Sequence, residues 1–125
     1  MTRPEAVRRV KSYSAADGYV YQYSFYEVNR AGQKEETAVE FVYAISIDRV
    51  STFQVRIHVL ERALRSWASV NGRALTSSEE YAVAKMRLFR AFDEGEVPHQ
   101  AVPASQAKLT VDSSNLEILL QQLNI

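Results

Sequence analysis

The chain has 125 residues, of which 46% are hydrophobic, and its 15 basic residues balance 15 acidic ones. This length and composition are typical of one globular domain that buries a core without disulfide or metal support. A formal net charge of zero provides no overall field that would attract nucleic acid, and the absence of cysteine excludes disulfides and thiolate chemistry. The N-terminal residues lack the apolar run of a signal peptide. We therefore expect a single domain over residues 1–125, located in the cytoplasm, with no membrane partner.

Residues 1–18 carry the weakest pattern of the chain. Thr2 and Glu5 have the spacing of a capping box, which is typical of a helix start. Few apolar residues follow, so a packed helix over residues 2–12 would have little to bury. We expect this segment to be a short helix, a strand arm or a flexible arm.

Large apolar residues then alternate with polar ones in three consecutive segments, at about 19–29, 34–47 and 52–58. In all three segments the large apolar residues fall mostly on odd-numbered positions. Alternation with period two is typical of a strand with one buried face. The pattern predicts a three-stranded antiparallel meander whose odd-numbered side chains point into one core.

Turn chemistry sets the expected register of the first hairpin. The segment 30–32 ends in Gly32, which suits a three-residue loop whose last residue has a positive φ. This closure would place Gln22 opposite Glu40 on the even-numbered face.

The second hairpin turns near residues 48–51. Only an odd number of loop residues keeps the apolar faces together, because a slip of one residue reverses every side chain. We therefore expect Glu40 to lie opposite His58, and Val42 to lie opposite Arg56.

The period becomes helical after the third strand. Residues 60–71 form an amphipathic stripe that ends before Gly72, a residue suited to the position after a helix. Thr76 and Glu79 then form a capping box, which predicts a second helix over about 77–94.

The C-terminal part is expected to be less regular. Residues 95–107 contain two prolines among small and polar residues and are predicted to be a linker or wrapping loop. A short strand at about 108–111 and a final helix at about 114–123 follow.

Together these elements predict a two-layer α+β fold, in which the two central helices cover one face of the meander. The order of a helix, three strands and a helix resembles that of double-stranded RNA-binding domains, and this likeness would imply RNA binding. Such domains carry a lysine-rich start to the helix after the third strand. This chain has Val59, Leu60, Glu61 and Arg62 there, which puts RNA binding in doubt.

The even-numbered face of the meander is expected to be open and polar. Gln22, Glu40 and His58 would form one row across it, with Arg56 beside them and Tyr26 as an open-face aromatic. A carboxylate beside an imidazole can work as an acid–base pair or contact a ligand. The alternative is a solvated ion pair that contributes a few tenths of a kcal/mol. Since no nucleophile or set of metal ligands accompanies the row, we predict no catalytic residue, metal or cofactor.

Two further features stand apart from this face. Lys85 falls within the apolar arc of the second central helix, where it would be either a buried amine with a lowered pKa or a stem whose ammonium reaches water or a carboxylate. Ile118 and Ile125 form a second apolar edge on the final helix. They indicate either a self-association surface or a frayed end.

We therefore carry three hypotheses about function. The first is a non-catalytic interaction module, expected to be a homodimer, that acts through a sheet edge, the open face or the C-terminal helix. The second is a small-ligand-binding domain or minor enzyme that uses Gln22, Glu40, Arg56 and His58. The third is a weak nucleic-acid binder that uses the basic N-terminal residues Arg3, Arg8, Arg9 and Lys11, against which a solvated arm is preferred.

Overall fold

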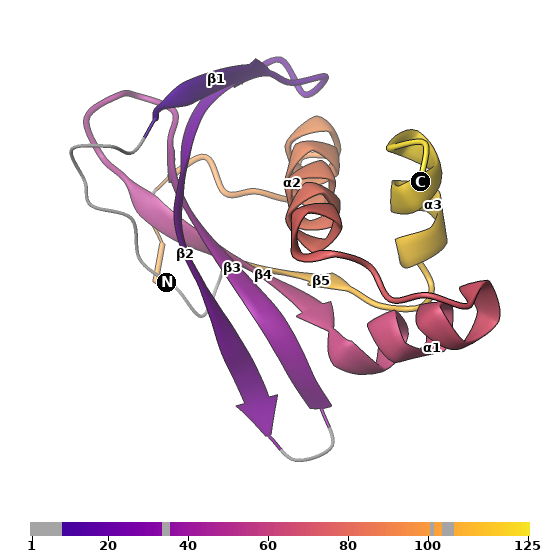
Figure 1. Ribbon diagram of the computed structural model, residues 1–125. Helices are drawn as coiled ribbons and strands as arrows, with labels where there is room; N and C mark the ends of the chain where they lie inside the picture. The colour runs from indigo at the N-terminus through magenta and orange to yellow at the C-terminus, as the bar shows by residue number, and fades with distance from the viewer. Residues whose placement is uncertain (1–8, 34–35, 101, 104–106) are drawn as a thin grey trace.

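The computed structural model describes residues 9–33, 36–100, 102–103 and 107–125 (Figure 1). In chain order the elements are β1 Lys11–Ser14, β2 Val20–Gln33, β3 Glu36–Ser46, β4 Phe53–Leu60, α1 Glu61–Asn71, α2 Ser77–Asp93, β5 Lys108–Val111 and α3 Leu116–Gln122. The strands form one sheet in the order β1-β2-β3-β4-β5, in which β5 is parallel to β4 and the other pairs are antiparallel. The predicted α+β class is confirmed, and the three strands of the expected meander are joined by β1 at one edge of the described sheet and by β5 at the other, where a short strand was expected at about 108–111.

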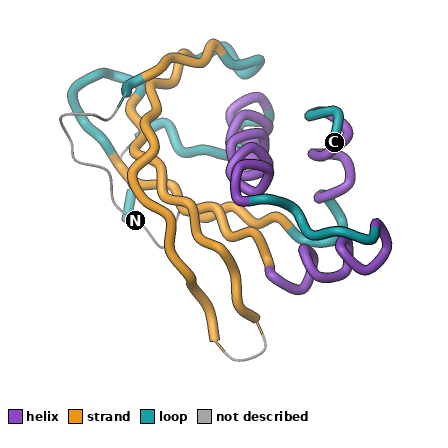
Figure 2. Tube along the Cα trace, viewed as in Figure 1, coloured by secondary structure: helices purple, strands orange, loops and turns teal. Residues whose placement is uncertain are grey.

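The sheet curls around α2, and the long β2–β3 ribbon extends beyond the helices (Figure 1, Figure 2). Helix α3 lies on the other side of α2, and α1 continues directly from the end of β4. Aromatic rings join the layers: the Tyr13 and Phe89 centroids are 4.3 Å apart, and those of Tyr21 and Phe92 are 4.0 Å apart. The helices therefore meet the inner side of a curved sheet.

The core follows the alternation in the sequence. The odd-numbered side chains of the central strands that are at most 6% exposed are Tyr21, Tyr23, Phe41, Tyr43, Ile45, Val55, Ile57 and Val59. Helix α2 meets them with Val83, Ala84, Leu88, Ala91 and Phe92, all fully buried. Burial of side chains of this size is worth roughly 1.5–3 kcal/mol each and is the main stabilising term of the fold.

The first hairpin differs from the prediction. Strand β2 continues to Gln33, and Gly32 pairs with Thr37 inside the ribbon, so the predicted loop at 30–32 is wrong. The register also shifts at a bulge between Phe25 and Glu27. One extra residue of β2 opposes β3 there, so the inward side of β2 changes from odd to even numbers beyond the bulge.

The second hairpin has the predicted register. Glu40 lies opposite His58 and Val42 lies opposite Arg56. Within the turn, Arg49 adopts the left-handed conformation, with φ 66°. Asp48 stabilises it, since one carboxylate oxygen accepts the backbone N–H groups of residues 50 and 51, each at 2.8 Å.

The central helices begin and end as the sequence indicates. Gly72, with φ 73°, ends α1 and donates its N–H to the Ala68 carbonyl at 2.9 Å. The predicted capping box of α2 is confirmed, because Thr76 Oγ1 accepts the Glu79 N–H at 3.1 Å while the Glu79 carboxylate accepts the Thr76 N–H at 2.9 Å.

The two weakly patterned segments add strands to the sheet edges. Lys11–Ser14 pairs with β2, so of the alternatives for this segment the strand arm is present and a helix over 2–12 is not formed at its described end; residues 2–8 lie outside the described ranges. The segment 95–107 is described in part, and it leads into β5. No helix within the described residues has both the length and the apolar character needed to cross a membrane.

Candidate functional site

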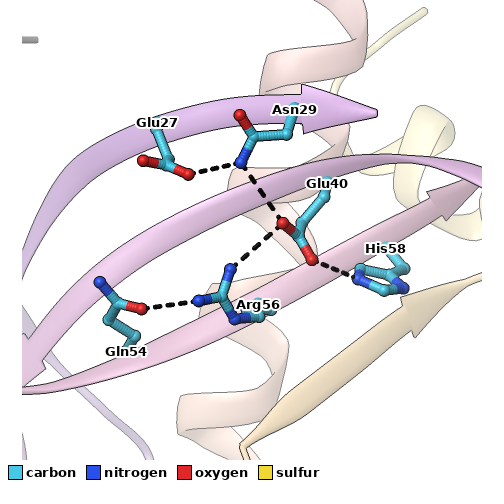
Figure 3. Close-up of polar contacts among 6 residues, drawn as sticks. All are labelled: Glu27, Asn29, Glu40, Gln54, Arg56 and His58. Carbon is cyan, nitrogen blue, oxygen red and sulfur yellow. Dashed lines mark hydrogen bonds and ion pairs between the residues drawn. The ribbon is translucent and has the colours of Figure 1, made fainter. Parts of the chain in front are cut away.

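The bulge in β2 brings polar side chains from three strands together on the outer side of the sheet (Figure 3). Glu40 is their centre: its Oε2 lies 2.7 Å from His58 Nε2, and its Oε1 lies 3.2 Å from the Arg56 guanidinium. Asn29 Nδ2 donates to Glu40 Oε1 at 3.4 Å and also to Glu27. Arg56 also donates to Gln54 at 2.9 Å. We call these six residues the Glu40 network.

The network holds Glu40 in its ionised form. Burial by itself disfavours the charged carboxylate, but hydrogen bonds from His58 and Asn29 and the charge of Arg56 outweigh it, so the pKa of Glu40 lies below its ordinary value. The side chains of Glu40 and His58 are 12% and 16% exposed, and that of Arg56 is 30% exposed. A carboxylate whose two oxygens already accept three donors has little capacity left for a ligand.

The predicted polar row is only partly present. Glu40, Arg56 and His58 come together as expected, but Gln22 lies opposite Ser46 rather than Glu40. Gln22 is 7% exposed, and its Oε1 has no hydrogen-bond partner among the described residues. The expected open face is also wrong in part, because Val42 on the same side is 1% exposed. Sequence reasoning missed Asn29, which only the bulge places opposite Glu40.

The other predicted residues lie apart from this network. Tyr26 falls at the bulge and is half-buried. Lys85 is half-buried on α2, with its Nζ 5.8 Å from the ring centroids of both Tyr23 and Phe89. Burial lowers the pKa of Lys85, and the nearby charge of Lys11 lowers it further.

The apolar residues expected on α3 are accessible. Ile118 is 46% exposed and Ile125 is 38% exposed. Val70 of α1, which is 83% exposed, lines a hollow of about 170 Å³ between α1 and the start of α3. Of the basic N-terminal cluster, Arg3 and Arg8 lie outside the described ranges.

A second polar cluster was not anticipated from the sequence. Tyr21 donates its hydroxyl to Asp17, and the same oxygen lies 3.0 Å from Nε2 of His99. Although desolvation opposes ionisation of Asp17, hydrogen bonds from Tyr21, the Tyr19 N–H and His99 outweigh it and lower the pKa of Asp17. The cluster ties the turn after β1 to the loop after α2. No local pattern reveals it, because Tyr21 and His99 are 78 positions apart.

On the inner side of the sheet, the ribbon and the start of α2 enclose a cleft of about 460 Å³. We call it the aromatic cleft. Its lining residues are Phe25, Val28, Asn29, Arg30, Val39, Phe41, Ser77, Glu80 and Tyr81. The Tyr81 ring meets Phe25 edge-on at a centroid distance of 5.2 Å, and it lies 6.2 Å from Phe41. The register beyond the bulge places Val28 opposite Phe41 and Arg30 opposite Val39, so the bulge also forms this wall of the cleft.

The two charged residues of the cleft differ in their partners. Arg30 is ion-paired with Glu61. The Glu80 carboxylate has no hydrogen bond or ion pair with a described residue. Burial raises the pKa of Glu80 above its ordinary value, and the Arg30 charge offsets this only in part. The cleft therefore holds a half-buried carboxylate beside aromatic walls, and the Arg30 charge compensates its burial only in part.

Comparison of the chain with models of protein families, with curated proteins and with solved structures gave no significant match. Among the described residues, no group of three or more histidine, aspartate or glutamate side chains is arranged to hold a metal ion.

Proposed function

We propose that the chain is a non-catalytic interaction module that receives an apolar side chain of a protein partner in the aromatic cleft. The cleft itself is the observation that supports this most. Binding sites are typically concave and mainly apolar, with a few polar groups that fix orientation. Phe25, Phe41 and Tyr81 provide such a surface, and aromatic residues contribute much of the energy at protein interfaces.

The Glu40 network favours a structural role over a catalytic one. Its donors and acceptors satisfy one another, and they come from β2, β3 and β4. A network of this kind holds three strands in one register, and here it fixes the strand segment beyond the bulge. The ligand-binding hypothesis that used Gln22, Glu40, Arg56 and His58 has less support, since Gln22 lies elsewhere on the sheet.

The proposal is tested by filling the cleft from its rim. Ser77 lines the cleft and is exposed, so Ser77→Trp places a large ring at its mouth without removing a core contact. Ser78 is also exposed but does not line the cleft, and Ser78→Trp is the matched control. The probe is hexan-1-ol, which mimics an apolar side chain, titrated into isotope-labelled protein and followed by NMR.

We expect chemical-shift changes at Phe25, Phe41 and Tyr81, with a dissociation constant in roughly the millimolar range expected for so small a ligand. The changes should persist in Ser78→Trp and weaken at least fivefold in Ser77→Trp. Shifts that are absent, or that occur equally in both variants, would contradict binding in the cleft.

Self-association through α1 and α3 is a second candidate, supported by the exposure of Val70, which lines the hollow between these helices, and of Ile118 on α3. Sedimentation velocity at two concentrations tests it. A dimer that dissociates in Ile118→Glu but not in Val50→Glu, a control at an exposed apolar residue of the β3–β4 turn, supports this candidate. A monomer at both concentrations rules out self-association through α1 and α3 and does not affect the cleft proposal.

A further inference from the structure

Resting on the proposed role of the aromatic cleft, we propose that its occupant is a cationic side chain of a protein partner, lysine or arginine. The apolar stem of that side chain lies against Phe25, Phe41 and Tyr81, and its charge pairs with Glu80. The aromatic walls by themselves would accept any apolar group, and Glu80 adds a preference for a positive charge.

The charged side chains of the cleft favour a cationic occupant. Glu61 accepts the Arg30 guanidinium and, at 2.8 Å, the Thr37 hydroxyl, so the positive charge on the rim of the cleft already has a partner. The Arg30 side chain is also 80% exposed, and it reaches toward α1 rather than the cleft floor. Glu80 is the charged group of the cleft that has no such partner among the described residues.

The aromatic walls of the cleft also favour a cation. A cation within about 6 Å of an aromatic face is attracted by the ring quadrupole, and this attraction grows when water is excluded. Glu80 and Tyr81 both line the cleft, and the Tyr81 ring contacts Phe25 and Phe41. A cation that pairs with Glu80 therefore lies beside rings, while its methylene stem covers apolar surface.

The environment of Glu80 is consistent with this assignment. Its pKa is raised because burial removes water from the carboxylate without supplying donors in return. A bound cation adds to the partial compensation from Arg30 and favours ionised Glu80. The negative charge is thus more favourable in the complex than in the free chain.

The experiment compares three probes of equal length, hexylammonium, hexan-1-ol and hexanoate, by NMR titration at neutral pH. Hexan-1-ol reports on apolar binding alone, which is the proposed function. We expect hexylammonium to bind roughly five- to tenfold more tightly than hexan-1-ol, the scale of one partly desolvated charge pair, and hexanoate to bind most weakly.

Glu80→Gln keeps the size of the side chain and removes its charge. In this variant the dissociation constants of hexylammonium and hexan-1-ol should lie within about twofold of each other. Glu117→Gln removes an equal charge from an exposed position on α3 and should leave the ratio of the two dissociation constants unchanged. Equal binding of the two probes to the unmodified chain, or tightest binding of hexanoate, overturns the cationic occupant while the cleft proposal stands. No shift at the cleft with any probe overturns both. If Glu80→Gln does not fold, the ratio of the hexylammonium and hexan-1-ol dissociation constants on the unmodified chain still tests the cationic occupant.

Discussion

Oε2 of Glu40 lies 2.7 Å from Nε2 of His58 on the adjacent strand, and the other oxygen of the same carboxylate accepts Arg56 and Asn29. This one side chain therefore joins β4 to β3 and to the part of β2 that lies beyond the bulge. The contact sits on the outer side of the sheet, opposite the wall of the aromatic cleft that the same bulge forms.

Replacing Glu40 by glutamine should destabilise the chain by about 1–3 kcal/mol at neutral pH, because buried donors lose a charged acceptor. The measurement is the free energy of unfolding in urea. Glu94→Gln is the control, since Glu94 forms an exposed i,i+4 pair with Arg90 at 3.2 Å, and such pairs contribute only about 0.3–0.5 kcal/mol. Equal losses in the two variants would contradict a stabilising role for the network.

The same variant has a defined pH dependence. The pKa of Glu40 is lower in the folded chain than in the unfolded chain, so the unfolded state binds more protons as the pH falls. The stabilisation by Glu40 is complete above its unfolded pKa and is lost as the pH drops through its folded pKa. Between about pH 5 and pH 3, the unfolding free energy should therefore fall less steeply in Glu40→Gln than in the unmodified chain. Parallel curves would show that Glu40 does not contribute.

Gly32 of the ribbon is expected to be harder to replace than Gly18 of the turn between β1 and β2. Its φ is 89°, and a Cβ built there would lie 2.0 Å from the Glu36 carbonyl oxygen. Gly18 has a similar φ of 95° but has no atom within 4 Å of a built Cβ, so Gly18→Ala is the matched control. The positive φ alone costs about 1–3 kcal/mol at either position.

The close approach to Glu36 adds to that cost at Gly32, so Gly32→Ala should lose more stability than Gly18→Ala. Urea denaturation measures the global loss, and amide hydrogen exchange across β2 and β3 measures local opening of the ribbon. A smaller effect in Gly32→Ala than in Gly18→Ala on both measures would show that the contact with Glu36 does not matter.

Replacing Lys85 by methionine should stabilise the chain, by up to about 1 kcal/mol. Burial and the Lys11 charge lower the pKa of Lys85, so the fold disfavours the ammonium even though two rings attract it. Methionine fills a similar volume without the charge. Urea denaturation at pH 7 is the measurement, and Lys108→Met, at an exposed position on β5, is the control. A loss of stability specific to Lys85→Met would mean that the contact with the Tyr23 and Phe89 rings outweighs burial.

The lowered pKa also gives Lys85 a pH signature. Between its folded pKa and its ordinary value, the unfolded chain binds a proton that the folded chain lacks, so stability rises with pH over that interval. Lys85→Met should remove this rise. An unchanged slope in the alkaline range would count against the assignment.

Local patterns in the sequence predicted the three central strands, β5, the three helices and half of the Glu40 network. Alternation located the three central strands, the capping box of Thr76 and Glu79 located α2, and the parity of the second turn placed Glu40 opposite His58. These features depend on residues close together in the chain or on the period of one strand. Among the alternatives left open for residues 1–18, the structure forms a strand at Lys11–Ser14, because that choice depends on pairing with β2 rather than on a local pattern.

The sequence by itself determined the α+β class, the inward side of each central strand up to the bulge, and the ends of the two central helices, since each rests on local periodicity or capping. Only the tertiary structure decided where the register shifts, which residue meets Glu40 and what encloses Glu80. A bulge leaves no local signature here, yet one inserted residue moves every following side chain of the strand to the opposite face. Asn29 thereby reaches the Glu40 network while Val28 and Arg30 lie on the inner side of the sheet, and that choice depends on long-range pairing with β3.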